Sequence, residues 1–270
     1  MSKKQKRSKR KGWFINPQQV EVWLNKASEQ LIRADYAGVV QTCQRILRYA
    51  PTASIERVDA LHYLGVAHSM LQDFDQAYEA LSEALTLRPN DPDLWYNRGL
   101  ASRFTTRSGQ ALRDHERAVE LGSIHELRDK FVEALDVSRK LAQASLELRG
   151  PNFALDQLIE QEELFQQGLK LMANYRWSEA EAIFRRVIAM GDCLPQPWAN
   201  LAGSLLMQER YDEAEAAWKR ALEIDPDYEL ARVNLALLPE TRRQGPPKSF
   251  KMVAPFEGHD LKKSITFLKG

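Results

Sequence analysis

The stretch PQPWANLAGSLLMQERYDEAEAAWKRALEIDPDY, residues 195–228, decides the fold of this chain. Its apolar residues recur at helical spacing in two successive segments, which predicts two amphipathic helices. Pro226 ends the second helix, because proline lacks an N–H group and disfavours helical geometry in the residue before it. Small residues allow the two backbones to approach, and bulky ones fill the gap between helices: Ala202, Ala214, Ala221, Trp198, Leu201, Leu205 and Trp218. The stretch therefore predicts one antiparallel helix pair.

The same spacing returns along the chain with a period of 34 residues, and a fixed period of this length indicates a repeat architecture. Segments 58–91 and 92–125 follow in one frame, and segments 20–53 and 161–194 are weaker copies. The matching residues of the clearest copy are Leu61, Leu64, Gly65, Phe74, Ala77, Leu81, Ala84 and Pro89. At these residues the chain resembles the tetratricopeptide repeat family. The resemblance implies an all-α fold, a right-handed superhelical solenoid of antiparallel helix pairs.

Five regions follow from this spacing and from the charge. We expect a basic, disordered arm over residues 1–12, a first block of about three repeats over 20–125, and a degenerate helical joint over 126–160. A second block of two repeats and a capping helix covers 161–238, and a basic, irregular tail covers 239–270. Within the joint, one long helix is predicted from about Ile124 to Leu148, and another begins at Phe153.

Charge is distributed unevenly along a chain whose net charge is only +1. The arm carries seven basic residues and no acid, namely Lys3, Lys4, Lys6, Arg7, Lys9, Arg10 and Lys11. Residues 239–270 carry +4, which leaves residues 12–238 at −10. The arm predicts contact with RNA, DNA or the ribosome, or a nuclear localisation signal in a eukaryote. The alternative is a solubilising tail that lies against the acidic body.

The resemblance also implies where a partner would bind, since the first helix of each repeat lines the concave groove in this family. The groove candidates of the second block are mostly apolar, and those of the first are mixed: Phe165, Leu169, Met172, Ala199, Leu206, His62, Tyr96, Asn97, Arg103 and Asn200. In this family a carboxylate clamp of Lys, Asn and Arg side chains holds the C-terminal tails of heat-shock chaperones. Only Asn97 and Asn200 match the residues of that clamp, so binding of such a tail is disfavoured. An apolar groove predicts a protein or peptide partner, or a cover formed by residues 250–256 or by the 126–148 helix.

The sequence offers no catalytic, metal or cofactor constellation. The histidines lack the spacing of metal ligands, and Cys43 and Cys193 form no paired motif. Acid pairs such as Glu162 and Glu163 are expected on solvated helix faces. No segment predicts a membrane span or a secretory signal, which favours a cytoplasmic protein. We expect a non-catalytic adaptor or scaffold; the alternatives are a polyanion-associated factor and a regulatory subunit of an enzyme complex.

Overall fold

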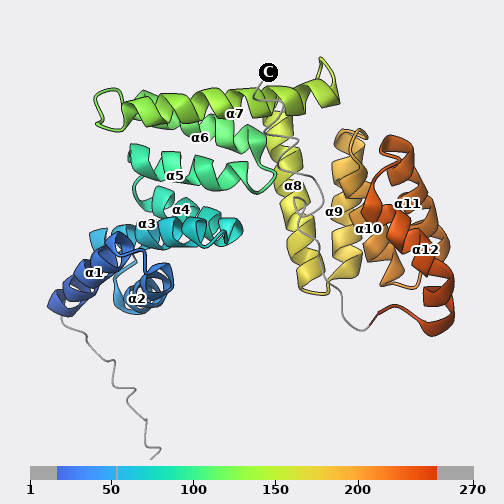
Figure 1. Cartoon of the computed structure of the whole chain (residues 1–270), viewed down its shortest axis with the longest axis horizontal. Coiled ribbons are helices and arrows are strands. Elements are labelled where there is room, and N and C mark those ends of the chain that lie inside the picture. Colours follow the sequence, from blue (N-terminus) through green and yellow to red (C-terminus); the bar gives the residue numbers. More distant parts are fainter. Residues whose placement is uncertain (1–16, 53, 248–270) are drawn as a thin grey trace, which may run out of the picture. The chain divides into compact units, whose positions relative to one another are not determined.

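The computed structural model describes residues 17–52 and 54–247, and these residues form twelve α-helices and no strand (Figure 1). Helices that follow one another along the chain lie antiparallel in pairs, so the all-α repeat architecture predicted from residues 195–228 is confirmed. The chain divides into two compact units between Ala101 and Ser102. The basic residues 3–11 and the apolar residues 250–256 lie outside the described residues.

The first unit contains α1 (Pro17–Ile32), α2 (Tyr36–Tyr49), α3 (Ile55–Met70), α4 (Phe74–Leu87) and most of α5 (Pro92–Arg103). Its core forms where small residues let helices approach. A Cβ atom added to Gly65 on α3 would lie 2.5 Å from the Leu81 side chain on α4, and Ala77 and Ala84 are fully buried. The small residues of the repeat therefore do what the sequence pattern predicts: they bring the two helices of a pair into close contact.

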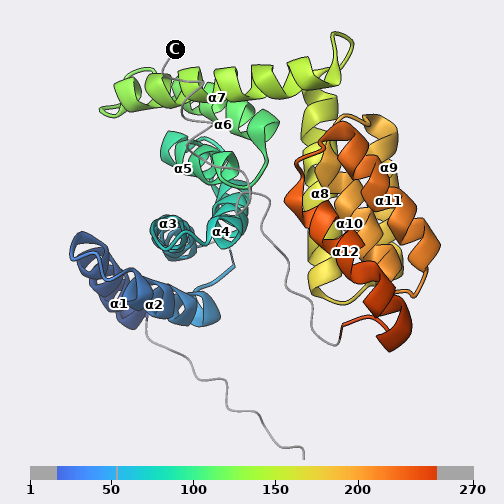
Figure 2. The ribbon, with the colours of Figure 1, turned by 45° about the vertical axis from the view of Figure 1, so that its right-hand side comes forward.

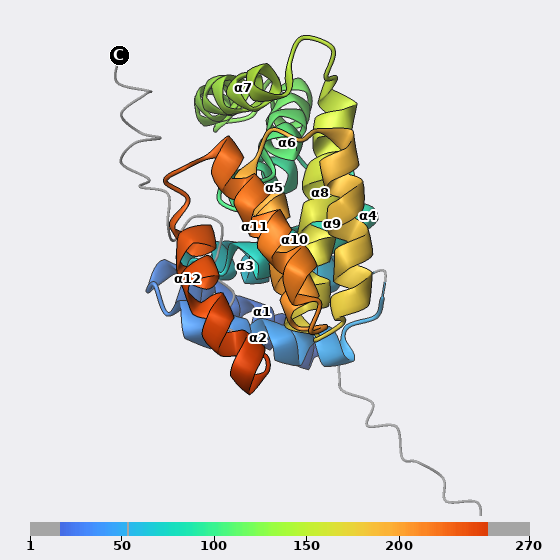
Figure 3. The same cartoon turned by 90° about the vertical axis from the view of Figure 1, so that its right-hand side faces the viewer.

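The second unit contains α6 (Ser108–Leu121), α7 (Arg128–Arg149), α8 (Leu155–Ala173), α9 (Trp177–Met190), α10 (Pro195–Leu206), α11 (Tyr211–Ile224) and α12 (Glu229–Gln244). Helices α8 to α11 lie side by side (Figures 2 and 3). Their core is built around Phe184 and Trp218. A smaller cluster of Leu112, Leu135 and Ala142 joins α6 to α7.

The turn inside each helix pair has one backbone design, and it occurs five times. A non-glycine residue with positive φ stands at the fifteenth place of each predicted repeat: Ala34, Gln72, Thr106, Tyr175 and Glu209. The N–H of the next residue donates to the carbonyl five residues earlier, as Asp73 does to His68 at 2.9 Å and Arg210 to Leu205 at 3.0 Å. This bond satisfies a carbonyl at the end of the first helix and turns the chain back.

The division into units differs from the predicted blocks, because α6 lies with the joint and not with the repeats before it. Gly109 on α6 packs so closely on α8 that an added Cβ would lie 2.9 Å from Ile159. The long helix of the joint is α7, which begins four residues later than predicted. Residues 122–127 form turns, and the Ile124 side chain is 99% exposed.

The predicted start of the tail at residue 239 is wrong, because α12 continues through Pro239 to Gln244. A proline inside a helix loses one hydrogen bond. The helix is held beyond it by tertiary contacts: Leu238 is buried, and Arg242 pairs with Asp212 at 2.6 Å and with Glu215 at 3.1 Å on α11.

Candidate binding pocket in the second unit

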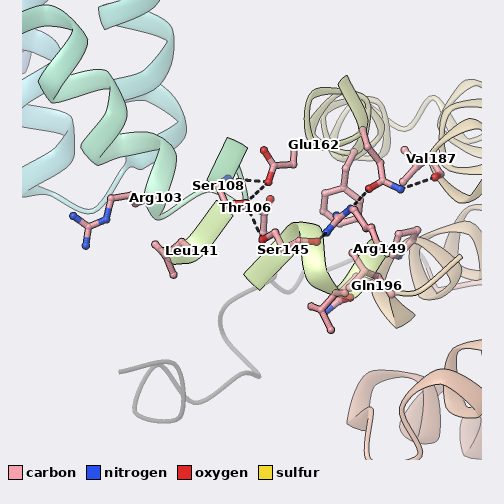
Figure 4. Close-up of a pocket in the computed structure, with 14 residues that line it drawn as sticks. Arg103, Thr106, Ser108, Leu141, Ser145, Arg149, Glu162, Val187 and Gln196 are labelled. Carbon is pink, nitrogen blue, oxygen red and sulfur yellow. Dashed lines mark hydrogen bonds between the residues drawn. The ribbon is translucent and has the colours of Figure 1, made fainter. Parts of the chain in front are cut away.

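A pocket of about 270 Å³ lies within the second unit (Figure 4). Helices α6 to α10 contribute to it, together with residues at the end of α5. Its apolar walls are formed by Leu141, Leu148, Phe165, Val187, Leu194 and Pro197. Its polar side chains include Ser108, Ser145, Arg149, Gln161, Glu162 and Gln196. Residues of the 92–125 repeat, the joint and the second repeat block thus form one site of mixed chemistry.

Glu162 on α8 is buried and caps the N-terminus of α6. Its Oε1 accepts from Ser108 N at 2.8 Å and from Ser108 Oγ at 2.6 Å, and its Oε2 accepts from Gly109 N at 3.0 Å. No side chain of α6 caps its own start, and the first turn of α6 contains no acid. A carboxylate that meets free N–H groups at a helix N-terminus is stabilised there, so Glu162 replaces the missing cap.

Burial sets the protonation of this carboxyl group. Loss of solvation raises the pKa of Glu162 to about 7, while the hydrogen bonds from Ser108 and Gly109 and the charge of Arg149 act in the opposite direction. The prediction that Glu162 and Glu163 both lie on a solvated face is wrong for Glu162, which is only 7% exposed. The reason is the α6 N-terminus, which contacts this face of α8.

Arg149, the last residue of α7, is fixed by two hydrogen bonds. Its Nε donates to Gln161 Oε1 at 2.6 Å, and its Nη1 donates to the Ser145 carbonyl at 2.7 Å. Gln161 is itself held by its Nε2, which donates to the Val187 carbonyl at 3.0 Å. Burial lowers the pKa of Arg149, and the charge of Glu162 acts against this shift. A chain of side chains from α7 through α8 to α9 thus orients the guanidinium group.

Gln196, in the first turn of α10, is the exception among these polar groups. Its Oε1 atom is buried and has no hydrogen-bond partner among the described residues. The prolines on either side of it, Pro195 and Pro197, are both buried. A buried acceptor without a partner is uncommon in folded proteins, so this atom marks a place where an outside group would be favoured.

The groove candidates of the second block have different environments. Phe165 lines the pocket. Met172, Ala199 and Leu206 are buried in the core around Phe184 and Trp218, and Leu169 packs against that core. Asn200 is half-buried, and its carbonyl accepts from Ser204 Oγ at 2.9 Å. Most of the apolar character that predicted a groove therefore belongs to internal packing.

In the first unit the structure brings two groove candidates together. Asn97 Nδ2 on α5 lies 3.2 Å from His62 Nε2 on α3, and it also donates to the Asp93 carbonyl at 2.8 Å. Burial lowers the pKa of His62, while nearby aspartates act in the opposite direction. Tyr96 on α5 is half-buried. Arg103, the last residue of α5, lines the pocket of the second unit.

Sequence reasoning missed Arg149, a polar residue of the pocket whose position in the joint follows no repeat spacing. Glu162 and Gln196 each stand at the second place of a repeat, which is one of the places that line the groove in this family. That spacing did not indicate that Glu162 would cap α6 or that the Gln196 acceptor would be buried without a partner among the described residues.

Two other features of the described residues bear on function. No group of three or more His, Cys, Asp or Glu side chains in residues 17–52 and 54–247 is arranged to hold a metal ion. None of the helices in these ranges combines the length and the apolar composition needed to cross a bilayer.

Comparison with known families agrees with the helix pairs. Residues 195–228 match the model described as "Tetratricopeptide repeat", and residues 67–102 match the model described as "TPR repeat". The first match has the same bounds as the repeat predicted over residues 195–228. The second begins inside α3 and ends inside α5, so it includes the whole of α4.

One curated relative is the human protein O-mannosyl-transferase TMTC1, 23% identical over 196 residues. The match covers 67% of this chain and 21% of that protein. Three solved structures are also similar. YrrB, titled a TPR protein with an unusual peptide-binding site, is 18% identical, with a TM-score of 0.36 and coverage of 80% of this chain and 91% of that one.

The second is the TPR2AB domain of yeast Sti1 in a pHSP90 complex, 13% identical, with a TM-score of 0.39 and coverage of 85% and 86%. The third is pilF of Pseudomonas aeruginosa, 13% identical, with a TM-score of 0.39 and coverage of 94% and 98%. Similarities this low carry no argument about function. The family matches show that the chain contains tetratricopeptide repeats, and the five turns of one design and the close helix pairs agree with them.

Proposed function

We propose that this protein is a non-catalytic adaptor that holds a segment of a partner protein, and that the pocket of the second unit anchors that segment. The tetratricopeptide repeats support the general class of protein-interaction adaptor. The single observation that carries the finer proposal is the pocket itself, in which apolar walls surround a few fixed polar groups. Sites that bind ligands commonly have this composition.

The size of the pocket favours a partner protein over a small ligand. Its volume of about 270 Å³ is below the roughly 300–1,000 Å³ that sites for whole small molecules occupy. A pocket of this size suits one or two residues of a longer segment. The rest of that segment would lie outside the pocket.

Two alternative roles are less well supported. Contact with nucleic acid or the ribosome depends on residues 3–11, which lie outside the described residues. A regulatory subunit of an enzyme complex would use the same protein-binding surface. Neither role has a specific observation in its favour within the described part of the chain.

The proposal is tested by selecting peptides from a random display library on the full chain and measuring their binding by fluorescence polarisation. Leu148→Glu places a charge on the apolar wall of the pocket, where the side chain is 64% exposed and its replacement leaves the core intact. Ile55→Glu is the matched control, since Ile55 is equally exposed on α3 in the first unit.

We expect Leu148→Glu to weaken the selected peptides by about tenfold or more, since it places a charge where an apolar side chain would bind. Ile55→Glu should leave their affinity unchanged. The proposal fails if no peptide is enriched, or if the two variants weaken binding equally.

A further inference from the structure

The polar groups of the pocket define the chemistry of the group that would fill it. Gln196 supplies an acceptor, because its buried Oε1 has no donor among the described residues. A ligand atom that reaches it must therefore be an N–H or O–H donor. Without such a donor, the loss of solvation of this oxygen is not offset by any hydrogen bond.

Arg149 supplies donors on the same pocket. A guanidinium group has five N–H donors, and the bonds to Gln161 and to the Ser145 carbonyl use Nε and Nη1. The Nη2 group stays available for an acceptor, and the two bonds fix the plane in which it lies. A ligand acceptor would thus meet a donor whose orientation is already set.

The charges of Arg149 and Glu162 partly offset one another, so the pocket accepts a neutral ligand group. The positive charge of Arg149 is opposed by the carboxyl group of Glu162, and each acts on the pKa of the other. Both Glu162 oxygens already accept hydrogen bonds from α6. Arg103, which also lines the pocket, has interactions of its own, and its guanidinium group is directed away from the Ser108 and Glu162 cluster (Figure 4).

We propose that the pocket binds a neutral amide next to a branched apolar side chain, with the amide carbonyl accepting from Arg149 and the amide N–H donating to Gln196. The inference rests on the proposed function, because it specifies which part of a bound segment enters the pocket. An amide offers an N–H donor and a carbonyl acceptor without charge and, unlike a hydroxyl, carries them on two separate atoms that can reach Gln196 and Arg149 at once. It occurs both in the main chain and in Asn and Gln side chains.

The test uses four small probes with one isobutyl skeleton, measured on the full chain by ligand-observed NMR. Isovaleramide represents a side-chain amide and N-methylisovaleramide a main-chain amide. Methyl isovalerate lacks the N–H donor, and isovalerate carries a negative charge. The variant is Gln196→Leu, and Gln76→Leu on α4 is the matched control, because Gln76 is exposed in the first unit.

We expect the amides to bind about fivefold more tightly than the ester, the difference expected for one hydrogen bond to a buried acceptor. In Gln196→Leu this ratio should fall to about one, since the donor loses its partner. Gln76→Leu should keep the ratio of the wild-type protein. The amide that binds more tightly identifies the source as main chain or side chain.

Equal affinity of amide and ester for the wild-type protein would overturn the inference, as would a ratio that Gln196→Leu leaves unchanged. Tighter binding of isovalerate would show that charge, and not an amide, is recognised. Binding of none of the probes also contradicts the inference. The proposed function is tested separately by the peptide selection. If the probes fail but the selected peptides still lose affinity in Leu148→Glu, the pocket binds a partner segment, but it recognises a group other than an amide.

Discussion

The repeat pairs and the contact between α6 and α8 are held together by different forces. In the repeats, a small residue faces a large apolar one, as Gly65 faces Leu81 and Gly168 faces Phe184. Between α6 and α8, the buried carboxyl group of Glu162 accepts from Ser108 and Gly109. Gln166 on α8 adds a bond of 2.7 Å to the Thr105 carbonyl before α6. The repeats are therefore stabilised by packing, and the contact between α6 and α8 by buried polar groups beside the pocket.

The largest expected effect is in the packing of the repeats. Phe184→Ala removes a fully buried ring that meets Gly168, and it should lower the free energy of unfolding by about 3–5 kcal/mol. Urea denaturation followed by circular dichroism measures this change. Val233→Ala on α12 removes a half-exposed side chain and should change stability by only about 0.5 kcal/mol. Equal effects of the two variants would contradict the account of the repeat core.

The contact between α6 and α8 should weaken when a single acceptor is lost. Glu162→Gln replaces one carboxyl oxygen by an amide nitrogen, which cannot accept from Gly109 or Ser108, and the expected cost is about 2 kcal/mol. Glu160→Gln, at an exposed side chain two residues earlier on α8, should change stability by less than about 0.5 kcal/mol. Hydrogen exchange of the Ser108 and Gly109 amides gives a local measurement, and it should accelerate in Glu162→Gln alone.

The same carboxyl group predicts a pH dependence of stability. Its pKa is raised to about 7 in the folded protein, above the value of an unfolded glutamate, so the folded state binds more protons between about pH 4.5 and 7. The free energy of unfolding should therefore fall as pH rises through this window, by an amount on the order of 2 kcal/mol. Glu162→Gln should lack this part of the pH dependence when denaturation is repeated from pH 5 to 8. A variant with the wild-type slope would show that another group titrates.

The smallest expected effect concerns the turns. Gln72 adopts a φ of 65°, a left-handed conformation that costs a non-glycine residue about 1–2 kcal/mol. Gln72→Gly should raise stability by about 0.5–1 kcal/mol, because relief of this strain exceeds the greater freedom of glycine in the unfolded chain. Differential scanning calorimetry would detect a higher melting temperature. A decrease would mean that the Gln72 side chain stabilises the turn.

The sequence predicted the repeats well, because their packing depends on residue size at fixed spacing. Ala77, Ala84 and Gly65 stand where the pattern requires small side chains, and all of them lie against a neighbouring helix. The turns also fall at one place of the repeat, although residue types as different as Ala34, Thr106 and Tyr175 occupy it. The hydrogen bond that closes each turn is a main-chain bond, so composition gives little sign of it.

The pocket could not be predicted in the same way. Glu162 lies on a helix face that reads as solvated, and only the contact with α6, some fifty residues earlier, buries it. Met172 and Leu206 match the spacing of a groove, but the same spacing serves the core, and they are buried there. Contacts between residues far apart in the sequence decide whether such a side chain is exposed, lines a pocket or lies in the core. The period of the repeat gives no information about these contacts.

Site-directed photo-cross-linking tests the central claim most directly, namely that the pocket of the second unit anchors a partner segment. A benzophenone amino acid is placed at position 148 on the pocket wall, or at position 55 as the equally exposed control, and a selected peptide is added. The account predicts a cross-linked product from position 148 and none from position 55. Cross-linking at position 55 with none at position 148 would contradict it.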